Sequence, residues 1–436
     1  MNKVKVGISR VCITPPLGTS MSGYFEARYC NQVLDDLYAT AVAFDDGERR
    51  AVVVACDLCD LKDEQWMKDC LNMVSDFCHI PAQAVMFTCS HTHTGPSVGF
   101  DVIANAPSNP VYDAFLMQRM RDVVYLALSD VRPARFYAAK TEVKDIAFCR
   151  TFRMKDGSVK TNPGIQNPDI LAPLSEVNQM ATVVKMVRED AEDILLVNFG
   201  VHADVIAGCA ISADFPGVMR KRLEQMHPGT MSVFLQGAEG DVNHIDVRGM
   251  DEDKNPRYVY MGMTLANAVN AVLDNMTEFA ADEICMSVKK LDIPANKENH
   301  RLEEAYRVHE LHKKGYKDEE LAEKSGIRMT GPEASRIIRL KDAPDLMPYW
   351  LYAIRVGEMV FAGLPGEPFG EIGKRIIDGS PYDTTLVCVL TNNDEVYFPT
   401  GDIYDERAYE AVSSFVKKGT DDMLVEGMIA LFDEVK

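Results

Sequence analysis

The stretch AVMFTCSHTHTGPS, residues 84–97, joins an apolar run to two histidines, His91 and His93, just before a Gly-Pro turn. The run is rich in strand-forming residues, and the turn marks the point where a strand should end. The chain has only nine histidines in 436 residues, so two in one short loop need an explanation. They are either functional groups at a strand end or surface residues of a turn, and the rest of the sequence discriminates between these interpretations.

Other short apolar runs alternate with longer stretches of helical periodicity. Strands are predicted at residues 50–58, 84–90, 181–187, 193–201, 231–237, 358–364 and 384–391. Helices are predicted at residues 63–77, 111–130, 216–226 and 258–276. This alternation predicts an α/β fold, with mixed β-sheet(s) flanked by helices. The last of these helices is apolar on most sides, so we expect it to be buried.

Polar side chains follow several of the predicted strands directly. His91 and His93 follow one strand, His202 follows a second, Glu367 a third and Tyr397 a fourth. Ligands of α/β proteins bind beyond the carboxyl ends of strands, where loops hold functional groups. Imidazoles, a carboxylate and a phenol from distant segments, without thiolates, are typical of a zinc-type site. The sequence therefore predicts a metal site at these strand ends, with His91 as a ligand and His93 beside it.

Each of these side chains also has a purely structural interpretation. His93 is compatible with a turn residue, Glu367 with a carboxylate at a helix start, and Tyr397 with a core aromatic residue. Asp241 is expected to accept backbone hydrogen bonds in its Gly-Asp turn. His244 is equally compatible with a substrate-facing and an exposed position.

The composition excludes several classes of partner. The chain has 46 lysine and arginine residues against 66 aspartate and glutamate residues, a formal net charge of −20. Such a surface repels nucleic-acid backbones and anionic membranes. No apolar run approaches the roughly 18 residues that a membrane-spanning helix requires. We therefore expect a small-molecule substrate, no nucleic acid and no membrane insertion, with homo-oligomerisation left open.

The N-terminus and the cysteines indicate a cytoplasmic protein. The opening residues, MNKVKVGISRVCITPP, lack the apolar core and cleavage site of a signal peptide. The 11 cysteines are odd in number and lack framework spacing, which is typical of reduced thiols. Cys56 and Cys59 form a single CxxC pair without a second one, so metal binding there is not expected.

The segment from 296 to 341 differs in composition from the rest of the chain because it is densely charged. His309 and His312 lie three residues apart in it, whereas a metalloprotease helix needs histidines at i and i+4. We expect a solvated helical hairpin that acts as a lid or an oligomer contact.

Seven stretches taken in order resemble the N-terminal catalytic region of the neutral/alkaline (non-lysosomal) ceramidases. They are VGISRVCITPPLGTSMSGY (6–24), ACDL, SHTHTGPS, NFGVHAD, FLQGAEGDVN, GLPGEPF and TNNDEVYFPTGDIYDERAYE (391–410). The resemblance covers essentially the whole chain. It implies one catalytic domain, residues 1–436, with the charged helical insertion at about 296–341 and without the C-terminal immunoglobulin-like domain of the family.

The resemblance also implies the functional residues. The ligands of a single Zn²⁺ would be His91, His202, Glu367 and Tyr397. The residues lining the substrate amide would be His93, Arg150 and Tyr409. Asp57 would orient a ligand or a water molecule.

One departure from the family pattern bears on the mechanism. The family has a serine where this chain has Asn243, and a carboxamide cannot form an acyl-enzyme. Hydrolysis by zinc-bound water remains, with Asn243 as a donor to the oxyanion and His93 as the group that transfers a proton to the leaving group.

The sequence therefore predicts a zinc-dependent, ceramidase-like hydrolase that cleaves an amide (N-acyl, C–N) bond in a small soluble substrate. Two alternatives stay open. The same zinc would serve a lactonase, an esterase or a phosphoester hydrolase, because the bond cleaved depends on the shape of the pocket. A ceramidase-like binding protein without catalysis would also keep this fold.

Overall fold

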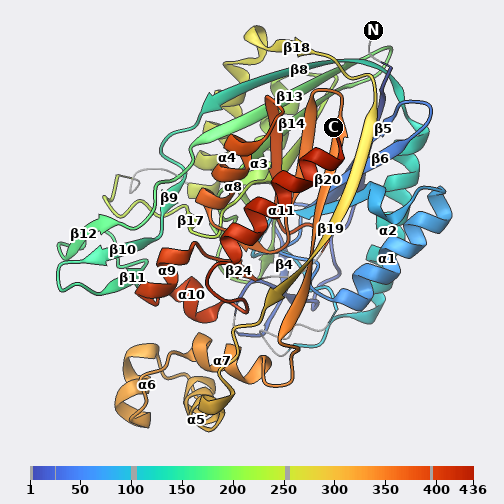
Figure 1. The fold of residues 1–436 in the computed structure, drawn as a ribbon. Helices are drawn as coiled ribbons and strands as arrows, with labels where there is room; N and C mark the ends of the chain where they lie inside the picture. The colour runs from blue at the N-terminus through green and yellow to red at the C-terminus, as the bar shows by residue number, and fades with distance from the viewer. Residues whose placement is uncertain (1–2, 25, 100–105, 251–255, 393–395) are drawn as a thin grey trace.

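The computed structural model describes residues 3–24, 26–99, 106–250, 256–392 and 396–436. Within them, nine strands form one large mixed sheet (Figure 1). Eight of these strands follow the order β16 (Thr230–Gln236), β14 (Asp193–Phe199), β13 (Met180–Arg188), β8 (Arg132–Glu142), β1 (Lys5–Cys12), β5 (Tyr38–Asp45), β6 (Arg50–Cys56) and β7 (Val85–Cys89). The ninth, β18 (Thr277–Phe279), pairs with β8. The β14–β16 and β6–β7 pairs are parallel, and the other pairs are antiparallel.

A second, four-stranded sheet packs face to face against the large one. Its order is β19 (Ile284–Pro294), β20 (Leu346–Val356), β21 (Met359–Gly363) and β23 (Thr384–Cys388). Apolar side chains of both sheets fill the space between them in one buried cluster. The rings of Phe44 on β5 and Phe361 on β21, for example, lie 5.7 Å apart. Strands such as β6 are buried on both faces, and every second residue points into this shared core while those between them pack on the opposite face.

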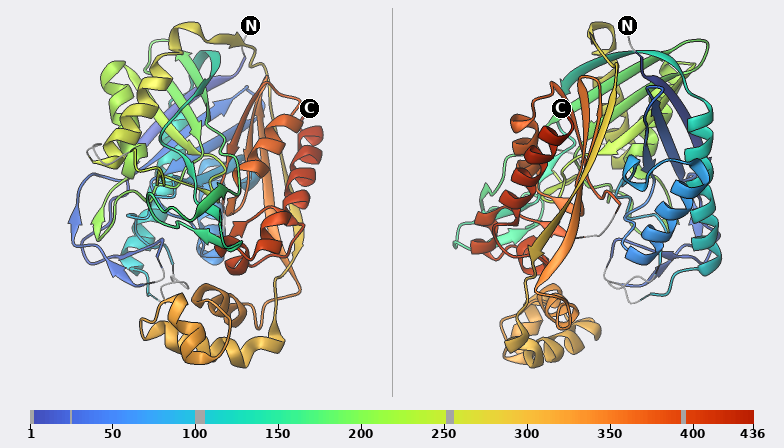
Figure 2. Two further views of the ribbon diagram at one scale, coloured as in Figure 1. Left: turned by 90° about the vertical axis from the view of Figure 1, so that its left-hand side faces the viewer. Right: turned by 45° about the vertical axis from the view of Figure 1, so that its right-hand side comes forward.

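Helices cover the outer faces of both sheets (Figure 2). On the large sheet they are α1 (Glu64–Cys78), α2 (Pro110–Ser129), α3 (Asp214–Met226) and α4 (Arg257–Asn270). On the small sheet they are α8 (Gly370–Gly379) and α11 (Thr420–Glu434). The predicted α/β class, with a mixed sheet flanked by helices, is confirmed. Among the described residues, no helix is both long and apolar enough to cross a bilayer.

All seven predicted strands are present, as β6, β7, β13, β14, β16, β21 and β23. The four predicted helices correspond to α1, α2, α3 and α4. The helix predicted over 258–276 ends earlier, at Asn270, and a 3-10 turn and β18 follow it. Only one side of α4 is buried, against α3, where Gly262 lies close to the Phe215 carbonyl. Its remaining residues are partly exposed, so the expectation of full burial is wrong.

The charged segment forms three helices rather than a hairpin. They are α5 (Leu302–Lys313), α6 (Asp318–Ser325) and α7 (Gly331–Arg339), here called the helical insertion. It has a small apolar core of its own, which a solvated hairpin would lack. Its helix α7 lies against α10 (Tyr409–Ser413), which follows the short helix α9 (Gly401–Glu406) (Figure 1). Buried Glu333 joins the two parts, accepting from Arg301 at 2.8 Å and from Arg407 at 2.9 Å.

Candidate metal centre

Strand ends from both sheets meet at one point. His91 lies two residues beyond β7, and His202 lies three residues beyond β14. Glu367 begins the short strand β22 (Glu367–Pro368), whose parallel partner β24 (Tyr397–Phe398) begins with Tyr397. Backbone hydrogen bonds join these loops: His93 N–H donates to Ala203 O at 3.1 Å, for instance. Four segments far apart in sequence are thereby held together.

The backbone of His91 adopts a conformation that is unusual for a residue with a side chain. Its φ is +63°, in the left-handed region, which costs a non-glycine residue roughly 1–2 kcal/mol. The strand β7 is continuous until Cys89, so this turn redirects the chain immediately after the strand. Such strain persists only where the surrounding structure imposes it, and it clusters at functional sites.

His91, His202 and Glu367 form a buried group, here called the metal cluster. The Nε2 atoms of His91 and His202 lie 3.4 and 3.0 Å from Glu367 Oε2. The other ring nitrogen of each histidine faces a backbone carbonyl. His91 Nδ1 lies 3.1 Å from Cys59 O. His202 Nδ1 lies 3.0 Å from Glu239 O. These contacts assign the proton to Nδ1 in both rings, so that both Nε2 lone pairs face the carboxylate.

This arrangement fits a metal cation. Two lone pairs and a carboxylate oxygen converge, and Glu367 Oε2 is buried without a hydrogen-bond donor. Burial alone would raise the pKa of Glu367, but the two histidines outweigh it and hold that pKa well below its usual value. Burial lowers the pKa of His91, yet Glu367 and Cys59 raise it well above the usual value. The carboxylate thus favours a positive charge beside it, which a bound cation supplies.

A buried guanidinium and two phenols border the cluster. Arg150 donates a hydrogen bond from Nε to Glu410 at 2.7 Å and another from Nη2 to Gly240 O at 2.5 Å. Its Nη1 atom lies 3.3 Å from His202 Nε2. Its guanidinium lies 5.0 Å from the ring of Tyr397 and 6.0 Å from that of Tyr409. Burial raises the pKa of Tyr397 well above its usual value, although Arg150 opposes the shift. Arg150 therefore links the cluster to both tyrosines.

His93 stands beside the cluster rather than within it. Its Nε2 lies 3.2 Å from His91 Nε2, and its Nδ1 lies 3.6 Å from Asp204 Oδ1. Tyr24 donates its hydroxyl hydrogen to the same Asp204 oxygen and meets the His93 ring edge-on at 5.4 Å. Burial, together with His91 and His202, lowers the pKa of His93 well below its usual value. The ring is therefore flanked by a ligand candidate on one side and a carboxylate on the other.

Asn243 lies behind another asparagine. Its Nδ2 donates to Asn162 Oδ1 at 2.6 Å, and its Oδ1 accepts from the Ile245 N–H at 3.0 Å. Asn162 lines the cavity at the metal cluster, whereas Asn243 does not. The sequence contains no signal for Asn162, because it belongs to the loop after β11 (Val159–Thr161), about 80 residues from Asn243.

Asp57 has a different role from the one implied by the resemblance. Arg220 of α3 donates from Nη1 to Asp57 Oδ1 at 2.5 Å and from Nη2 to Oδ2 at 2.6 Å. The Tyr38 N–H also donates to Oδ2, at 2.9 Å. Both oxygens are therefore engaged in a buried ion pair, and the expectation that Asp57 orients a metal ligand is wrong. Asp241 accepts a backbone hydrogen bond at 2.7 Å from Gly370, which lies 129 residues away, rather than from its own Gly-Asp turn.

The sequence analysis assigned no role to three acidic or phenolic groups that lie near the cluster. Tyr24 and Asp204 contact His93, and Glu239 lies buried beside His202 with no donor to either carboxyl oxygen. Burial raises the pKa of Glu239 well above its usual value, which favours the neutral acid. Asp204 and Glu239 both follow predicted strands, so the rule that predicted the ligands also pointed to them.

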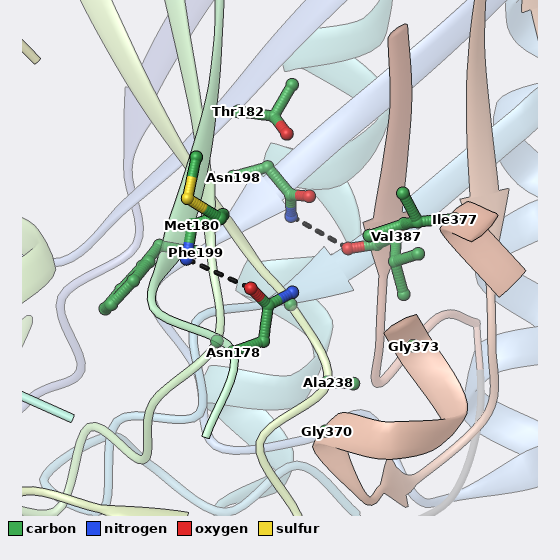
Figure 3. A pocket seen from close by; sticks show the side chains of 12 residues that line it. Asn178, Met180, Thr182, Asn198, Phe199, Ala238, Gly370, Gly373, Ile377 and Val387 are labelled. Atoms are coloured by element: carbon green, nitrogen blue, oxygen red, sulfur yellow. Dashed lines mark hydrogen bonds between the residues drawn. The ribbon is translucent and has the colours of Figure 1, made fainter. Parts of the chain in front are cut away.

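The cluster opens into a cavity of about 780 Å³. Its lining includes His93, Arg150, His202, Glu367, Tyr397 and Tyr409, together with α7 and the loop after β11. A second cavity, of about 30 Å³, lies between the sheets and α8 (Figure 3). There Asn198 of β14 donates to Val387 O of β23 at 2.8 Å. That space holds about one water molecule and has no imidazole or carboxylate in its lining, so the cavity lined by His202 and Glu367 is the candidate substrate site.

No protein-family model matches the chain. No curated protein matches it in sequence either. Among solved structures, it is similar to the neutral ceramidase from Pseudomonas aeruginosa, with a TM-score of 0.75 and 16% sequence identity over 99% of this chain and 74% of that chain. It is also similar to a ceramidase complexed with C2, with a TM-score of 0.74 and 14% identity over 99% and 75% of the two chains. At these identities the similarity establishes a shared fold.

Proposed function

We propose that this protein is a zinc-dependent hydrolase that cleaves an amide C–N bond in a small-molecule substrate. The observation that carries the proposal is the convergence of His91 Nε2 and His202 Nε2 on Glu367 Oε2 at the base of the large cavity. The fold shared with neutral ceramidases favours amide hydrolysis over other reactions of the same metal.

The zinc ligands would be His91, His202, Glu367 and Tyr397. The Nε2 atoms of both histidines lie 3.0 and 3.4 Å from Glu367 Oε2, and imidazole nitrogen and carboxylate oxygen are donors that would suit one zinc ion. Tyr397 is the register partner of Glu367 in the β22–β24 pair and lines the same cavity, which supports its inclusion among the ligands. When bound, the zinc would acidify a water molecule and polarise the scissile carbonyl.

His93 is the proposed proton carrier. In hydrolysis, the water oxygen bonds to the carbonyl carbon, the C–N bond breaks, and the proton lost by the water passes to the leaving nitrogen. His93 Nε2 faces the cluster and would take and return that proton. Asp204 lies beside Nδ1, where a carboxylate holds the ring in one orientation, and Tyr24 holds Asp204.

The oxyanion would be stabilised by the asparagine pair. Asn162 lines the cavity, and Asn243 fixes its side chain from behind through the 2.6 Å hydrogen bond. Asn243 then acts as a positioning residue, and Asn162 supplies the N–H donor to the developing charge. Arg150 and Tyr409 line the same cavity and would orient the substrate amide.

The test compares two buried glutamates that lie close to His202. Glu367→Gln removes a proposed ligand, while Glu239→Gln replaces a buried carboxyl, with a pKa raised by burial, that does not line the cavity. Elemental analysis of the purified proteins should find about one zinc per chain in the wild type and in Glu239→Gln, and much less in Glu367→Gln. Tightly bound zinc that persists in Glu367→Gln would refute the ligand assignment.

A parallel activity screen identifies the bond. Short N-acyl compounds should be hydrolysed faster than lactones, esters and phosphoesters, and faster than long-chain ceramide. Cleavage confined to lactones or phosphoesters would leave the metal assignment intact and replace the amidase assignment. A zinc-loaded protein that hydrolyses none of these classes would be a binding protein.

A further inference from the structure

The turn after β6 holds Cys59, a buried cysteine that contacts the metal cluster. β6 and β7 are parallel neighbours, so their carboxyl ends lie at the same edge of the sheet, and the loop after β7 carries His91. Cys59 Sγ lies 3.7 Å from His91 Nδ1, and the Cys59 carbonyl oxygen lies 3.1 Å from the same nitrogen. The strand order therefore places a sulfur donor against a proposed zinc ligand.

His93 approaches the other nitrogen of the same imidazole. Its Nε2 lies 3.2 Å from His91 Nε2, and the two rings meet edge-on with their centroids 4.7 Å apart. One donor atom from each of Cys59, His91 and His93 lies within 4.8 Å of the other two, and all three residues are buried. These three residues, here called the thiol cluster, bring one sulfur and two imidazoles together.

The thiol of Cys59 has different surroundings from those of neighbouring cysteines. Cys56 and Cys89 are members of the apolar core. Cys56 is the other half of the CxxC pair, and its Sγ lies 3.9 Å from Val54 O and 4.0 Å from Met120 Sδ. The two thiols of the pair thus meet different groups, and it is Cys59 that meets an imidazole.

An ion reaches the thiol cluster through the substrate cavity. His93 lines that cavity, whereas Cys59 and His91 are not part of its lining. Two carboxylates stand close by: Glu367 Oε2 is 3.4 Å from His91 Nε2, and Asp204 Oδ1 is 3.6 Å from His93 Nδ1. Negative charge in a buried region attracts a cation strongly, because little water screens it.

The two groups that share His91 differ in the cations that they favour. In the metal cluster, His91 is joined by the imidazole of His202 and the carboxylate of Glu367, which is a hard donor. In the thiol cluster, His91 is joined by the imidazole of His93 and the sulfur of Cys59. Thiolate sulfur selects soft ions such as Cu⁺, and imidazole also suits copper. The softest cations should therefore prefer the thiol cluster.

We propose that Cys59, His91 and His93 form a second metal site, which binds a soft, thiophilic cation of the Cu⁺ and Cd²⁺ class. On binding, the Cys59 thiol releases its proton to water and the thiolate bonds to the ion. The ion also engages His91, which the metal cluster needs, and His93, which faces the substrate cavity. It therefore displaces zinc and inhibits hydrolysis. The inhibition rests on the function proposed above, whereas the binding of the cation does not.

Cadmium is the probe, because it does not change oxidation state and its bond to a thiolate gives an ultraviolet charge-transfer band. The three partly exposed cysteines, Cys12, Cys209 and Cys285, are first replaced by alanine so that their thiols do not contribute. The full-length, zinc-loaded protein with these replacements is titrated with cadmium chloride. The band should saturate at about one cadmium per chain, and a zinc-sensitive dye should detect about one zinc released.

Three further variants locate the site in this background. Cys59→Ala keeps the backbone carbonyl that orients His91, so it should retain zinc and lose the cadmium band. His93→Ala should weaken cadmium binding at least about tenfold, since a lost ligand costs no less than a lost group that orients one. Cys56→Ala removes the other thiol of the pair and should leave both the band and the affinity unchanged.

Several results would overturn the site. They are cadmium binding without the band, a band that survives in Cys59→Ala, an unchanged affinity in His93→Ala, and cadmium uptake that leaves bound zinc in place.

The two proposals fail in different ways. If the protein is an amidase, cadmium should abolish the hydrolysis of short N-acyl compounds, and Cys59→Ala should relieve this inhibition. A Cys59-dependent band in a protein that hydrolyses none of these compounds would support the thiol cluster and refute the amidase function. Amide hydrolysis by a protein that shows no such band would refute the thiol cluster alone.

Discussion

The metal cluster and the helical insertion line the same cavity, but they are held in different ways. In the cluster, backbone groups orient each side chain: carbonyls accept from both imidazoles, and the Glu367 N–H donates to Val396 O at 2.8 Å. The insertion is attached mainly by side chains, with Glu333 bound to two arginines and Arg336 bound to the Val412 carbonyl.

Because the two regions are held differently, we expect the metal cluster to determine the reaction and the helical insertion to determine substrate selectivity. Side chains at strand ends fixed by backbone hydrogen bonds have one orientation, which a metal site requires. A wall attached through side chains can change without disturbing the sheets. We therefore expect changes in the cluster to affect metal content and kcat, and changes in the insertion to affect KM and the choice of substrate.

The largest effect is expected from His202→Ala. Loss of a proposed ligand should lower kcat/KM by at least about 10⁴-fold, because the residues that would hold the zinc needed to acidify water would be incomplete. Chelation of the wild type should cause a similar loss, reversible with zinc. His300→Ala, at an exposed position, is the control and should behave as wild type. A His202→Ala protein with more than a tenth of the wild-type rate would contradict the expectation that the metal cluster determines kcat.

The next largest effect is expected from disrupting the buried ion pair between Asp57 and Arg220. Arg220→Ala leaves Asp57 buried without its partner and should lower the free energy of unfolding by about 3–5 kcal/mol. Chemical denaturation measures this loss, and zinc content should stay unchanged. The double variant Asp57→Asn/Arg220→Met should recover part of the stability. Loss of zinc without loss of stability would show that Asp57 does orient a ligand.

The asparagine pair tests whether the cavity wall contributes to the chemistry. Asn162→Ala should lower kcat by roughly 10²–10³-fold with little change in KM, because the hydrogen bond forms mainly in the transition state. Asn243→Ala should have a similar effect, and the double variant should be no slower than either single one. Additive effects would mean that the two side chains act separately. Intact-protein mass spectrometry during turnover should detect no acyl adduct.

Asp214 supplies a pH dependence of stability. Its carboxylate accepts from Val205 and Ile206, in the loop after His202, and burial raises its pKa from 3.8 to about 6. Between about pH 4 and 6 the folded state binds a proton that the unfolded state does not. The free energy of unfolding should therefore fall as pH rises through this window, by up to about 3 kcal/mol from this group.

Asp214→Asn tests this assignment. The variant should have a flatter profile of unfolding free energy between pH 4 and 6, measured by denaturant titration at several pH values. Asp402→Asn, at an exposed position, should keep the wild-type profile. An unchanged slope in Asp214→Asn would assign the pH dependence to another group.

The smallest effect is expected in the insertion. Glu333→Gln weakens the contacts to Arg301 and Arg407 and should destabilise α7 locally by about 1–2 kcal/mol. Hydrogen exchange in α7 should accelerate, KM should rise a few-fold, and kcat should stay nearly constant. Glu323→Gln, exposed on α6, is the matched control. A large fall in kcat would show that the insertion also supports the chemistry.

Much of the arrangement of strands and helices was predictable from local sequence patterns. β-branched runs predicted seven strands, and polar residues directly after them predicted the group that contains His91, His202 and Glu367. The strands β1, β5, β8, β19 and β20 were not predicted. The true end of α4 was missed because its apolar pattern continues past Asn270, where the chain turns into β18.

The sequence by itself determined the α/β class and which side chains stand at strand ends, because both follow from periodicity along a few consecutive residues. Only the tertiary structure decided their roles. Asp57 and Glu367 are both carboxylates at strand ends, yet one meets Arg220 and the other meets two imidazoles. These partners lie more than 160 residues away, and no local pattern encodes which segments will pack together.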